Sequence, residues 1–350
     1  MKKTKEVIIG NVKIGGGNPI AVQSMTNTKT EDAAATVAQL LAFEQAGANI
    51  ARITVNTEAA ERALPDILRE TKLPIVADIH FSLERAIGAI EAGVHKIRFN
   101  PGNIGSRERV EKLVALAKER NVPIRIGVNS GSIENDLLAK YGNTTQALVE
   151  SALRHVDILE KCGFYDIVVS AKASNPVKTV ETYRELSKMV EYPLHLGVTE
   201  AGHGRLAEYK SVAAMGSLLM DGIGDTIRIS LTGDPVAEIH AGKDLLRAVG
   251  RDTGFVNVIS CPTCGRTVIP VEEIAKEVAL RTKDVRTPLT VAVMGCVVNG
   301  IGEGKDCDIG IAGGEGKSAL ISGGQVIGTV PNDRLIDELM KHIWERVKNG

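Results

Sequence analysis

The stretch PIVADIHFSLERAIGAIEAGVHKIRFN, residues 74–100, contains the unit from which the first part of this chain is built. It begins with a short apolar run at 74–79, continues with an amphipathic segment, and ends with a second apolar run at 95–100. Short apolar runs bounded by turn residues indicate buried strands, and apolar residues at helical spacing indicate a helix. A strand, a helix and another strand in this order predict two parallel strands joined by a helical crossover.

The same unit recurs from residue 20 to about residue 248. Its apolar runs lie at 20–25, 49–54, 74–79, 95–100, 123–128, 165–170, 193–198 and 225–230. Eight strand–helix units over about 230 residues match the number and length of a closed (β/α)8, or TIM-like, barrel. An open doubly wound sheet is the alternative, but the first turn between strand and helix lacks a G-x-G-x-x-G pattern.

The regular alternation of predicted strands and helices ends after residue 250. A helical run at 270–282, strands at 289–295 and 308–314, a strand pair at 318–330 and a closing helix at 332–349 follow. We therefore predict an α/β chain of two domains, a TIM-like barrel over residues 1–250 and a smaller α+β domain over residues 251–350.

Composition excludes several classes of protein. The formal net charge is −1 and only 3% of residues are aromatic, which argues against a general nucleic-acid binder. No apolar run approaches the roughly 20 residues that span a membrane, and no signal peptide is recognisable. We expect a cytoplasmic protein, in which the five cysteines stay reduced and serve as metal ligands or nucleophiles before disulfides.

Positively charged side chains follow many of the predicted strands. In a (β/α)8 barrel the carboxyl ends of the strands build the active site. Five of the eight strands place a cation there: Arg52, Arg98, Arg125, Lys172 and Arg228. Crowded cations repel each other unless an anion lies between them, and the guanidinium fork suits phosphate oxygens. We therefore expect a small substrate with more than one phosphate group in the barrel mouth.

Other polar residues lie at the same strand ends. We expect them to contribute to substrate binding, and they are Asp78, His80, Asn100, Asn129, His195, Thr199 and Ser230. Glu200, in VTEAG, is the best candidate for an acid or base, because it lies beside a strand end among cations. His80 and His195 compete for that role.

Three cysteines and a carboxylate in the second domain predict a metal site. Cys261 and Cys264 lie in SCPTCGRT (260–267), and Cys296 and Glu303 lie in GCVVNGIGE (295–303). On counting alone, zinc could be bound by these three cysteines together with Cys307. An iron–sulfur cluster held by three thiolates would instead leave one iron with a weaker carboxylate ligand. The zinc alternative describes a phosphate-binding barrel enzyme without redox chemistry.

Motifs along nearly the whole chain resemble the IspG/GcpE family, the 4-hydroxy-3-methylbut-2-enyl diphosphate synthases. They lie at 22–28, 76–81, 97–105, 124–132, 170–174, 194–202, 224–231, 260–267 and 295–303. The resemblance implies an iron–sulfur oxidoreductase of non-mevalonate isoprenoid biosynthesis. Its reaction converts 2-C-methyl-D-erythritol 2,4-cyclodiphosphate into 4-hydroxy-3-methylbut-2-enyl diphosphate, a two-electron reductive ring opening with loss of water.

The resemblance also implies roles for single residues. A [4Fe–4S] cluster would be bound by Cys261, Cys264, Cys296 and Glu303, in a second domain similar to a sulfite/nitrite-reductase module. The diphosphate would contact Arg52, Arg98, Arg125, Lys172, Arg228 and Ser230, with Asn129 nearby, and Glu200 would act as acid or base. The family acts as a head-to-tail homodimer and receives electrons from flavodoxin or ferredoxin.

This chain departs from the family pattern around the fourth ligand. Ile301 stands where the family usually has Pro, and Gly304 where it usually has Ala. The loop expected to carry Glu303 is therefore expected to be more mobile. Cys307, at a position that is often small, lies close enough in sequence to compete with Glu303 for that position.

Overall fold

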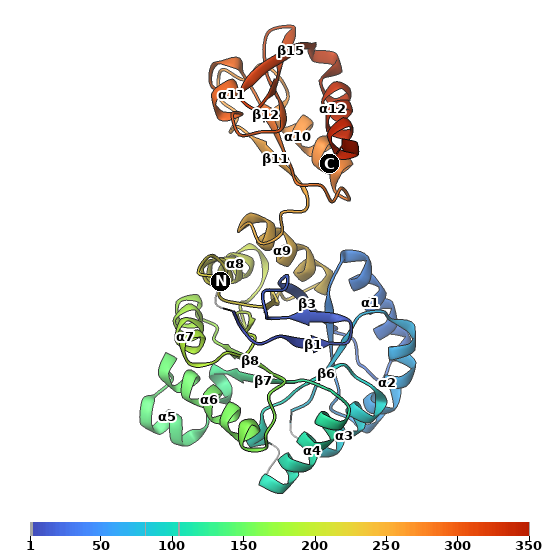
Figure 1. Ribbon diagram of the computed structural model, residues 1–350, viewed down its shortest axis with the longest axis vertical. Helices are drawn as coiled ribbons and strands as arrows, with labels where there is room; N and C mark the ends of the chain where they lie inside the picture. Colours follow the sequence, from blue (N-terminus) through green and yellow to red (C-terminus); the bar gives the residue numbers. More distant parts are fainter. Residues whose placement is uncertain (1–2, 81, 104–105, 350) are drawn as a thin grey trace. The chain divides into compact units, whose positions relative to one another are not determined.

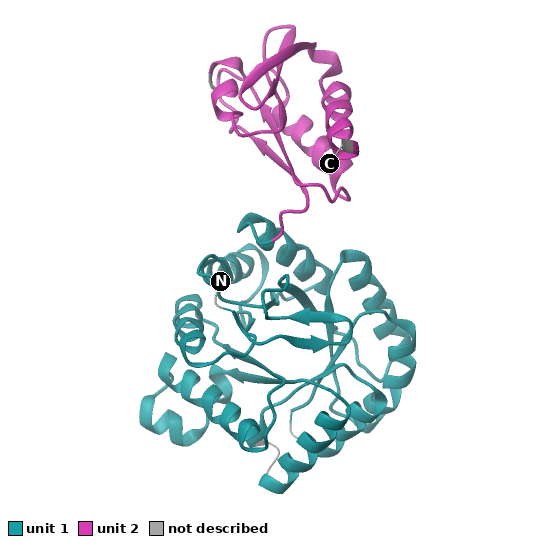
Figure 2. Cartoon of the chain, viewed as in Figure 1, with its two compact units in different colours: residues 1–251 teal, residues 252–350 magenta. Residues whose placement is uncertain are grey.

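The computed structural model describes residues 3–80, 82–103 and 106–349. The chain divides into two compact units, residues 1–251 and residues 252–350 (Figure 2). Phe81, Ile104 and Gly105, which belong to two of the motifs above, lie outside the described residues.

The first unit is a TIM-like barrel, as predicted (Figure 1). Its parallel strands are β3 (Ala21–Met25), β4 (Ile50–Thr54), β5 (Ile75–Asp78), β6 (Lys96–Arg98), β7 (Ile124–Asn129), β8 (Ile167–Lys172), β9 (His195–Leu196) and β10 (Thr226–Ile227). Each strand pairs with the next, and β10 pairs with β3. An isolated bridge between Val169 and Leu194 joins β8 to the residue before β9, which closes the ring. All eight predicted strands are confirmed.

Helices connect the strands around the outside of the barrel (Figure 1). They are α1 (Ala33–Ala46), α2 (Glu58–Glu70), α3 (Leu83–Ala92), α4 (Arg107–Glu119), α5 (Asn135–Tyr141), α6 (Thr145–Lys161), α7 (Pro176–Met189), α8 (Gly204–Met220) and α9 (Pro235–Ala248). Short 3-10 turns cover Pro101–Asn103 and Ser130–Ser132. The helix starts follow local rules, since Asp32, Thr57 and Ser82 each accept a backbone N–H of the first turn.

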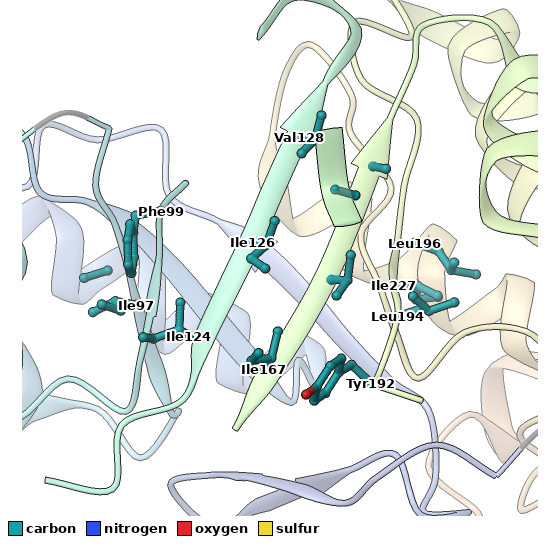
Figure 3. Close-up of a cluster of buried hydrophobic side chains, with 14 of the residues drawn as sticks. Ile97, Phe99, Ile124, Ile126, Val128, Ile167, Tyr192, Leu194, Leu196 and Ile227 are labelled. Carbon is teal, nitrogen blue, oxygen red and sulfur yellow. The ribbon is translucent and has the colours of Figure 1, made fainter. Parts of the chain in front are cut away.

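Side chains alternate between the two faces of each barrel strand. Ile124, Ile126 and Val128 of β7 point away from the barrel axis and join the core between strands and helices (Figure 3). The other face of β7 turns Arg125 into the barrel. An N-terminal hairpin that was not predicted, β1 (Val7–Ile9) and β2 (Val12–Ile14), packs its apolar residues against the first residues of the strands, including Ile50. The barrel is therefore closed by apolar side chains at one end and is polar toward the other.

The second unit is a five-stranded mixed sheet with helices. Its strands, in spatial order, are β11 (Val256–Ser260), β12 (Leu289–Met294), β13 (Ile309–Ala312), β14 (Lys317–Ser322) and β15 (Gln325–Pro331). The first three are parallel, and β14 is antiparallel to both of its neighbours. The helices are α10 (Val271–Thr282), α11 (Val297–Glu303) and α12 (Leu335–Asn349), with a 3-10 turn at Asn332–Arg334.

The strands and helices that were predicted for this unit are confirmed, but α11 and β11 were missed. The sequence of β11, VNVIS, is short and only partly apolar. The expected likeness to a sulfite/nitrite-reductase module stays a prediction. Among the described residues of the whole chain, no helix is both long enough and apolar enough to cross a membrane.

Candidate active site and candidate cluster site

A cavity of about 120 Å³ lies at the carboxyl ends of the barrel strands. It is lined by Arg52, Asp78, His80, Arg98, Arg125, Asn129, Ser170, Lys172, Thr199, Arg228 and Ser230. Sequence reasoning predicted all of these except Ser170, a serine within β8 whose hydroxyl donates to the carbonyl oxygen of Ile126 at 3.1 Å. The parallel strands bring these residues together because all of their carboxyl ends meet at one end of the barrel.

Asp78 is the carboxylate in this cavity, and two arginines flank it. Its oxygens lie 3.3 Å from Nη1 of Arg98 and 3.7 Å from Nη2 of Arg52. Nε2 of His80 is 3.9 Å away. Burial opposes ionisation of Asp78, but Arg52 and Arg98 more than offset it, so that its pKa falls to about 2. Asp78 is therefore a fixed negative charge that orients two of the cations.

Backbone and sulfur atoms hold the same arginines from their other side. Nη2 of Arg98 donates to the carbonyl oxygen of Gly127 at 2.6 Å. Nε of Arg52 points at the sulfur of Met25 at 3.0 Å. Each guanidinium is thus held by Asp78 and by one further acceptor, and its remaining N–H groups are left for a ligand.

Two residues that were expected to bind the substrate lie behind the cavity instead of lining it. Asn100 is buried, and its side chain pairs with both backbone groups of Gly127. His195 is fully buried, with Nε2 3.3 Å from Nζ of Lys172 and Nδ1 2.7 Å from Oγ1 of Thr226. Burial lowers the pKa of His195 well below its usual value, which favours a neutral ring. The Nε2 atom of this ring contacts the Nζ atom of Lys172.

Glu238 is the most important residue that sequence reasoning missed. It lies on α9, is 2% exposed, and contacts Arg228. It also accepts hydrogen bonds from the hydroxyl of Ser24 at 2.8 Å and the backbone N–H of Leu231 at 3.1 Å. The sequence did contain a signal for it, because Glu238 lies between Pro235 and Ile239 on the buried face of α9. Carboxylates are almost never fully buried unless they are paired.

Glu200 follows Thr199 but is exposed and does not line the cavity. Its φ of 52° lies in the left-handed region, which is costly for a residue other than glycine. Strained backbone of this kind is concentrated at functional sites. Glu200 is therefore an exposed residue that directly follows the lining residue Thr199 and has a backbone conformation that local sequence does not favour.

Positive charge exceeds negative charge around the cavity. Five cations line it, whereas the carboxylates that pair with them are Asp78 and Glu238. Burial and neighbouring cations lower the pKa values of Arg125 and Lys172 well below their usual range. Among the described residues, Nε and Nη1 of the buried Arg125 have no hydrogen-bond partner. An anionic ligand would supply both the missing charge and the missing acceptors.

The second unit contains a separate cavity of about 160 Å³. The four predicted metal ligands line it: Cys261, Cys264, Cys296 and Glu303. The two first cysteines follow β11, whereas Cys296 and Glu303 lie at the two ends of α11. The expectation of a loop around Glu303 is wrong, because the N–H groups of Gly300 and Gly304 bond to the carbonyls of Cys296 and Gly300 in helical fashion.

The surroundings of two of these thiols suit anionic sulfur. The sulfur of Cys261 accepts the backbone N–H of Gly295 at 3.1 Å. A backbone N–H of Arg266, assisted by its guanidinium, lowers the pKa of the exposed Cys264. Within the described ranges, no three His, Cys, Asp or Glu side chains are grouped as a metal ion would need them. The four candidate ligands instead line one cavity, and cysteine thiolates are the residues that hold iron–sulfur clusters.

Cys307 lies in a different environment from the other three cysteines of this unit. It is 2% exposed and packs in an apolar cluster with Met294 and Ile321. Burial raises the pKa of its thiol, and it does not line the cavity. Of the two candidates for the fourth ligand, the structure brings Glu303 to the cavity and leaves Cys307 in the core.

Comparisons with protein families match nearly the whole chain. The model of the GcpE TIM-barrel domain matches residues 4–243, and that of the GcpE protein C-terminal domain matches residues 257–345. A protein of Caldanaerobacter subterraneus subsp. tengcongensis named 4-hydroxy-3-methylbut-2-en-1-yl diphosphate synthase (flavodoxin) is 53% identical, covering 99% of this chain and 98% of its own. Proteins of the same name from Clostridium perfringens and Fusobacterium nucleatum are 52% and 49% identical, covering 98% and 99% of both chains respectively.

Solved structures show likeness in fold. The dihydropteroate synthase of Xanthomonas albilineans superposes with a TM-score of 0.51 at 16% identity, covering 71% of this chain and 98% of its own. The 7,8-dihydropteroate synthase of Vibrio fischeri superposes with a TM-score of 0.51 at 15% identity, covering 70% and 98%. These likenesses support the barrel fold alone.

Proposed function

The chain belongs to the GcpE family, and from that premise we propose that it performs the reaction for which its relatives are named, the flavodoxin-dependent formation of 4-hydroxy-3-methylbut-2-en-1-yl diphosphate. The substrate is 2-C-methyl-D-erythritol 2,4-cyclodiphosphate, which is opened by two electrons with loss of water. The observation that carries this proposal is the excess of buried cations in the barrel cavity. The zinc-stabilised, redox-free alternative finds no support among the relatives.

The second unit would hold the redox cofactor. The residues fit an iron–sulfur cluster, because three cysteines and one carboxylate surround one cavity and two of the thiols accept or lie near N–H donors. We propose a [4Fe–4S] cluster bound by Cys261, Cys264, Cys296 and Glu303. Such a cluster supplies single electrons and an iron that can act as a Lewis acid toward a substrate oxygen.

The barrel residues bind and orient the substrate. Among the lining cations, Arg52, Arg98 and Arg125 come from β4, β6 and β7. Lys172 comes from β8, which is opposite β4 in the strand order. Arg228 and Ser230 follow β10, which is opposite β6. Cations fixed before binding stabilise the charge that develops on a departing phosphate oxygen, since no reorganisation is needed when the bond breaks. Asn129, His80 and Thr199 also line the cavity and can offer hydrogen-bond donors to the substrate.

Glu200 would hold or deliver a proton next to Thr199, which lines the cavity. Loss of a hydroxyl group as water requires a proton, and a carboxyl group beside the cavity can supply it. The left-handed backbone at Glu200 supports a functional position for this residue. Normal turnover by a Glu200→Gln variant would contradict this role.

The remaining parts of the proposal concern partners. Flavodoxin is the electron donor in the relatives' names, and we extend it to ferredoxin. We also propose a head-to-tail homodimer in which each barrel receives electrons through the cluster unit of the partner chain. A cytoplasmic location agrees with the five free cysteines of the described structure.

The first experiment is metal and sulfide analysis of protein purified without oxygen, followed by turnover of the cyclic diphosphate with reduced flavodoxin. About four iron and four sulfide per chain, together with product formation, would support the proposal. One zinc without sulfide would contradict the cluster. Clusters without turnover of the cyclic diphosphate would contradict the assigned substrate.

A further inference from the structure

Lys96 lies inside the barrel but does not line the cavity described above. It is on β6 two residues before Arg98, so both side chains point toward the barrel interior. Its side chain is fully buried, and among the residues that the structure describes no acceptor lies within hydrogen-bond distance of Nζ. Its neighbour on β5 is Val76, which belongs to the apolar layer that closes the barrel. Lys96 therefore lies between that layer and the cationic cavity.

The charged and titratable side chains that project into the barrel around Lys96 are mostly cations. They are Arg52 on β4, Asp78 on β5, Arg98 on β6, Arg125 on β7, Lys172 on β8, His195 on β9 and Arg228 after β10, and Glu238 on α9 lies behind Arg228. Both carboxylates already pair with arginines, Asp78 with Arg52 and Arg98, and Glu238 with Arg228. No carboxylate in this part of the structure is left to pair with Lys96.

A buried ammonium group without a counterion is costly, and such a group loses its proton instead. Burial lowers the pKa of Lys96 well below its usual value, and the charges of Arg125 and Arg52 lower it further. Lys172 lines the cavity, where an anion can reach it, whereas Lys96 is fully buried with no acceptor at Nζ among the described residues, so this geometry favours the neutral amine for Lys96 in the ligand-free protein. A bound diphosphate brings at least two negative charges into the cavity lined by Arg98, which is two residues along β6 from Lys96, and the low-dielectric interior screens such charges only weakly.

We propose that Lys96 is a positioning residue that takes up a proton when the cyclic diphosphate binds, so that its positive charge forms beneath the phosphates only in the complex. This inference rests on the proposed binding of substrate in the barrel cavity. The amine gains one proton from solvent, and no bond of the substrate forms or breaks.

The sign of the pH dependence follows from this uptake. Binding raises the pKa of Lys96, so its contribution to affinity is fully present below the pKa in the free protein. The contribution is lost as pH rises through the higher pKa of the complex. Between those values the dissociation constant rises by up to about tenfold per pH unit for one proton.

The test is calorimetric titration of the full-length, cluster-loaded protein with the cyclic diphosphate, without an electron donor. Titrations in two buffers of different ionisation enthalpy give the number of protons taken up. Lys96→Met removes the amine at similar volume, and we expect it to take up about one proton fewer than wild type, with a flatter pH dependence of affinity. We also expect a higher melting temperature without substrate, because an unpaired buried amine is removed.

The control is Lys112→Met, which changes an exposed lysine of α4 and should leave the proton count and the affinity unchanged. Lys96→Gln, also uncharged, is the second variant should the methionine protein fold poorly, and the same proton count is expected. An unchanged count in either uncharged variant would overturn the inference.

Arg125→Met separates this inference from the proposed function. Wild-type affinity in Arg125→Met would show that the substrate does not bind in the barrel cavity, which would overturn the proposed site and the Lys96 inference together. Weakened binding in Arg125→Met, with an unchanged proton count in Lys96→Met, would overturn the role of Lys96 alone.

Discussion

The guanidinium of Arg228 and the carboxylate of Glu238 form a two-point pair. Nε of Arg228 lies 3.0 Å from Oε2 of Glu238, and Nη2 lies 3.0 Å from Oε1. Arg228 lines the cavity, whereas Glu238 is buried on α9. Because the pair uses one edge of the guanidinium, Arg228 presents its remaining N–H groups to the cavity in one orientation. Helix α9 is therefore part of the binding site, although it contributes no lining residue.

Glu238→Gln removes the charge of this pair and replaces one acceptor by a donor. We expect KM for the cyclic diphosphate to rise by about tenfold or more, and the free energy of unfolding to fall by about 3 kcal/mol, because one partner of a buried ion pair is lost. Steady-state kinetics and urea unfolding measure the two effects, with iron content as a check on the second unit. Asp244→Asn, on the same helix but exposed, should change neither. An unchanged KM in Glu238→Gln would show that Arg228 does not need this anchor.

Gly127→Ala should weaken substrate binding by displacing Arg98. A Cβ atom at Gly127 would lie 2.8 Å from Nη2 of Arg98, which is closer than real contacts allow. The guanidinium is already fixed by Asp78 and the carbonyl of Gly127, so it must leave both partners. We expect a loss of affinity by calorimetry with a folded barrel by circular dichroism.

Gly131→Ala is the matched control for this change. A Cβ atom at Gly131 would meet no atom of the described residues within 4 Å. Equal affinities of the two alanine variants would contradict the account of Arg98.

Asp78 should make stability depend on acid pH. Its pKa of about 2 lies below the ordinary value of 3.8, because Arg52 and Arg98 outweigh the effect of burial. A lowered pKa contributes stability that is present above the unfolded value and is lost as pH falls through the folded value. About 2 kcal/mol should therefore disappear between about pH 4 and pH 2.

Urea unfolding of wild type and Asp78→Asn across this range measures the effect. The variant should have a lower free energy of unfolding at neutral pH. Between pH 4 and pH 2 its free energy of unfolding should fall less than that of wild type, because the contribution of Asp78 is absent. Asp66→Asn, an exposed residue of α2, should follow wild type. Parallel acid slopes for wild type and Asp78→Asn would contradict the assigned pKa.

The cysteines of the second unit should separate into two groups by iron content. Anaerobically purified Cys264→Ala should lose most of its iron, because it removes a residue that lines the cluster cavity. Cys307→Ala should keep its iron and lose only about 1 kcal/mol of stability, because a small buried group is removed from an apolar cluster. Retained iron in Glu303→Ala together with lost iron in Cys307→Ala would reverse the assignment of the fourth ligand.

The barrel could be predicted because its pattern is periodic and repeated. Each apolar run was followed by an amphipathic segment, and errors in single strands do not change a pattern of eight. The β1–β2 hairpin and β11 were missed because runs of only three to five residues carry little periodic signal. These strands exist because tertiary packing against Ile50 and β12 stabilises them.

Most residues that line the candidate site were predicted from the sequence, but the residues behind them that hold their side chains in place, such as Glu238, were not. Arg52, Arg98 and Arg125 were found because strand ends in a barrel converge. Asn100 follows the end of β6, but its side chain turns to Gly127, whereas His195 is the first residue of β9 and its ring turns to Thr226, so neither side chain lines the cavity. Position along a strand gives the level in the barrel, but hydrogen-bond partners decide whether a side chain reaches the cavity.

The sequence by itself determined the barrel, the smaller second domain, the row of cations at the strand ends and the set of candidate thiolates. These features depend on periodicity and on residue type, which are local. Only the tertiary structure decided that Glu238 holds Arg228, that the buried Nζ of Lys96 has no hydrogen-bond partner among the described residues, and that Glu303 reaches the cavity while Cys307 does not. Charge pairing and burial arise between elements far apart in the chain, and the free energy of such contacts exists only after the elements have packed.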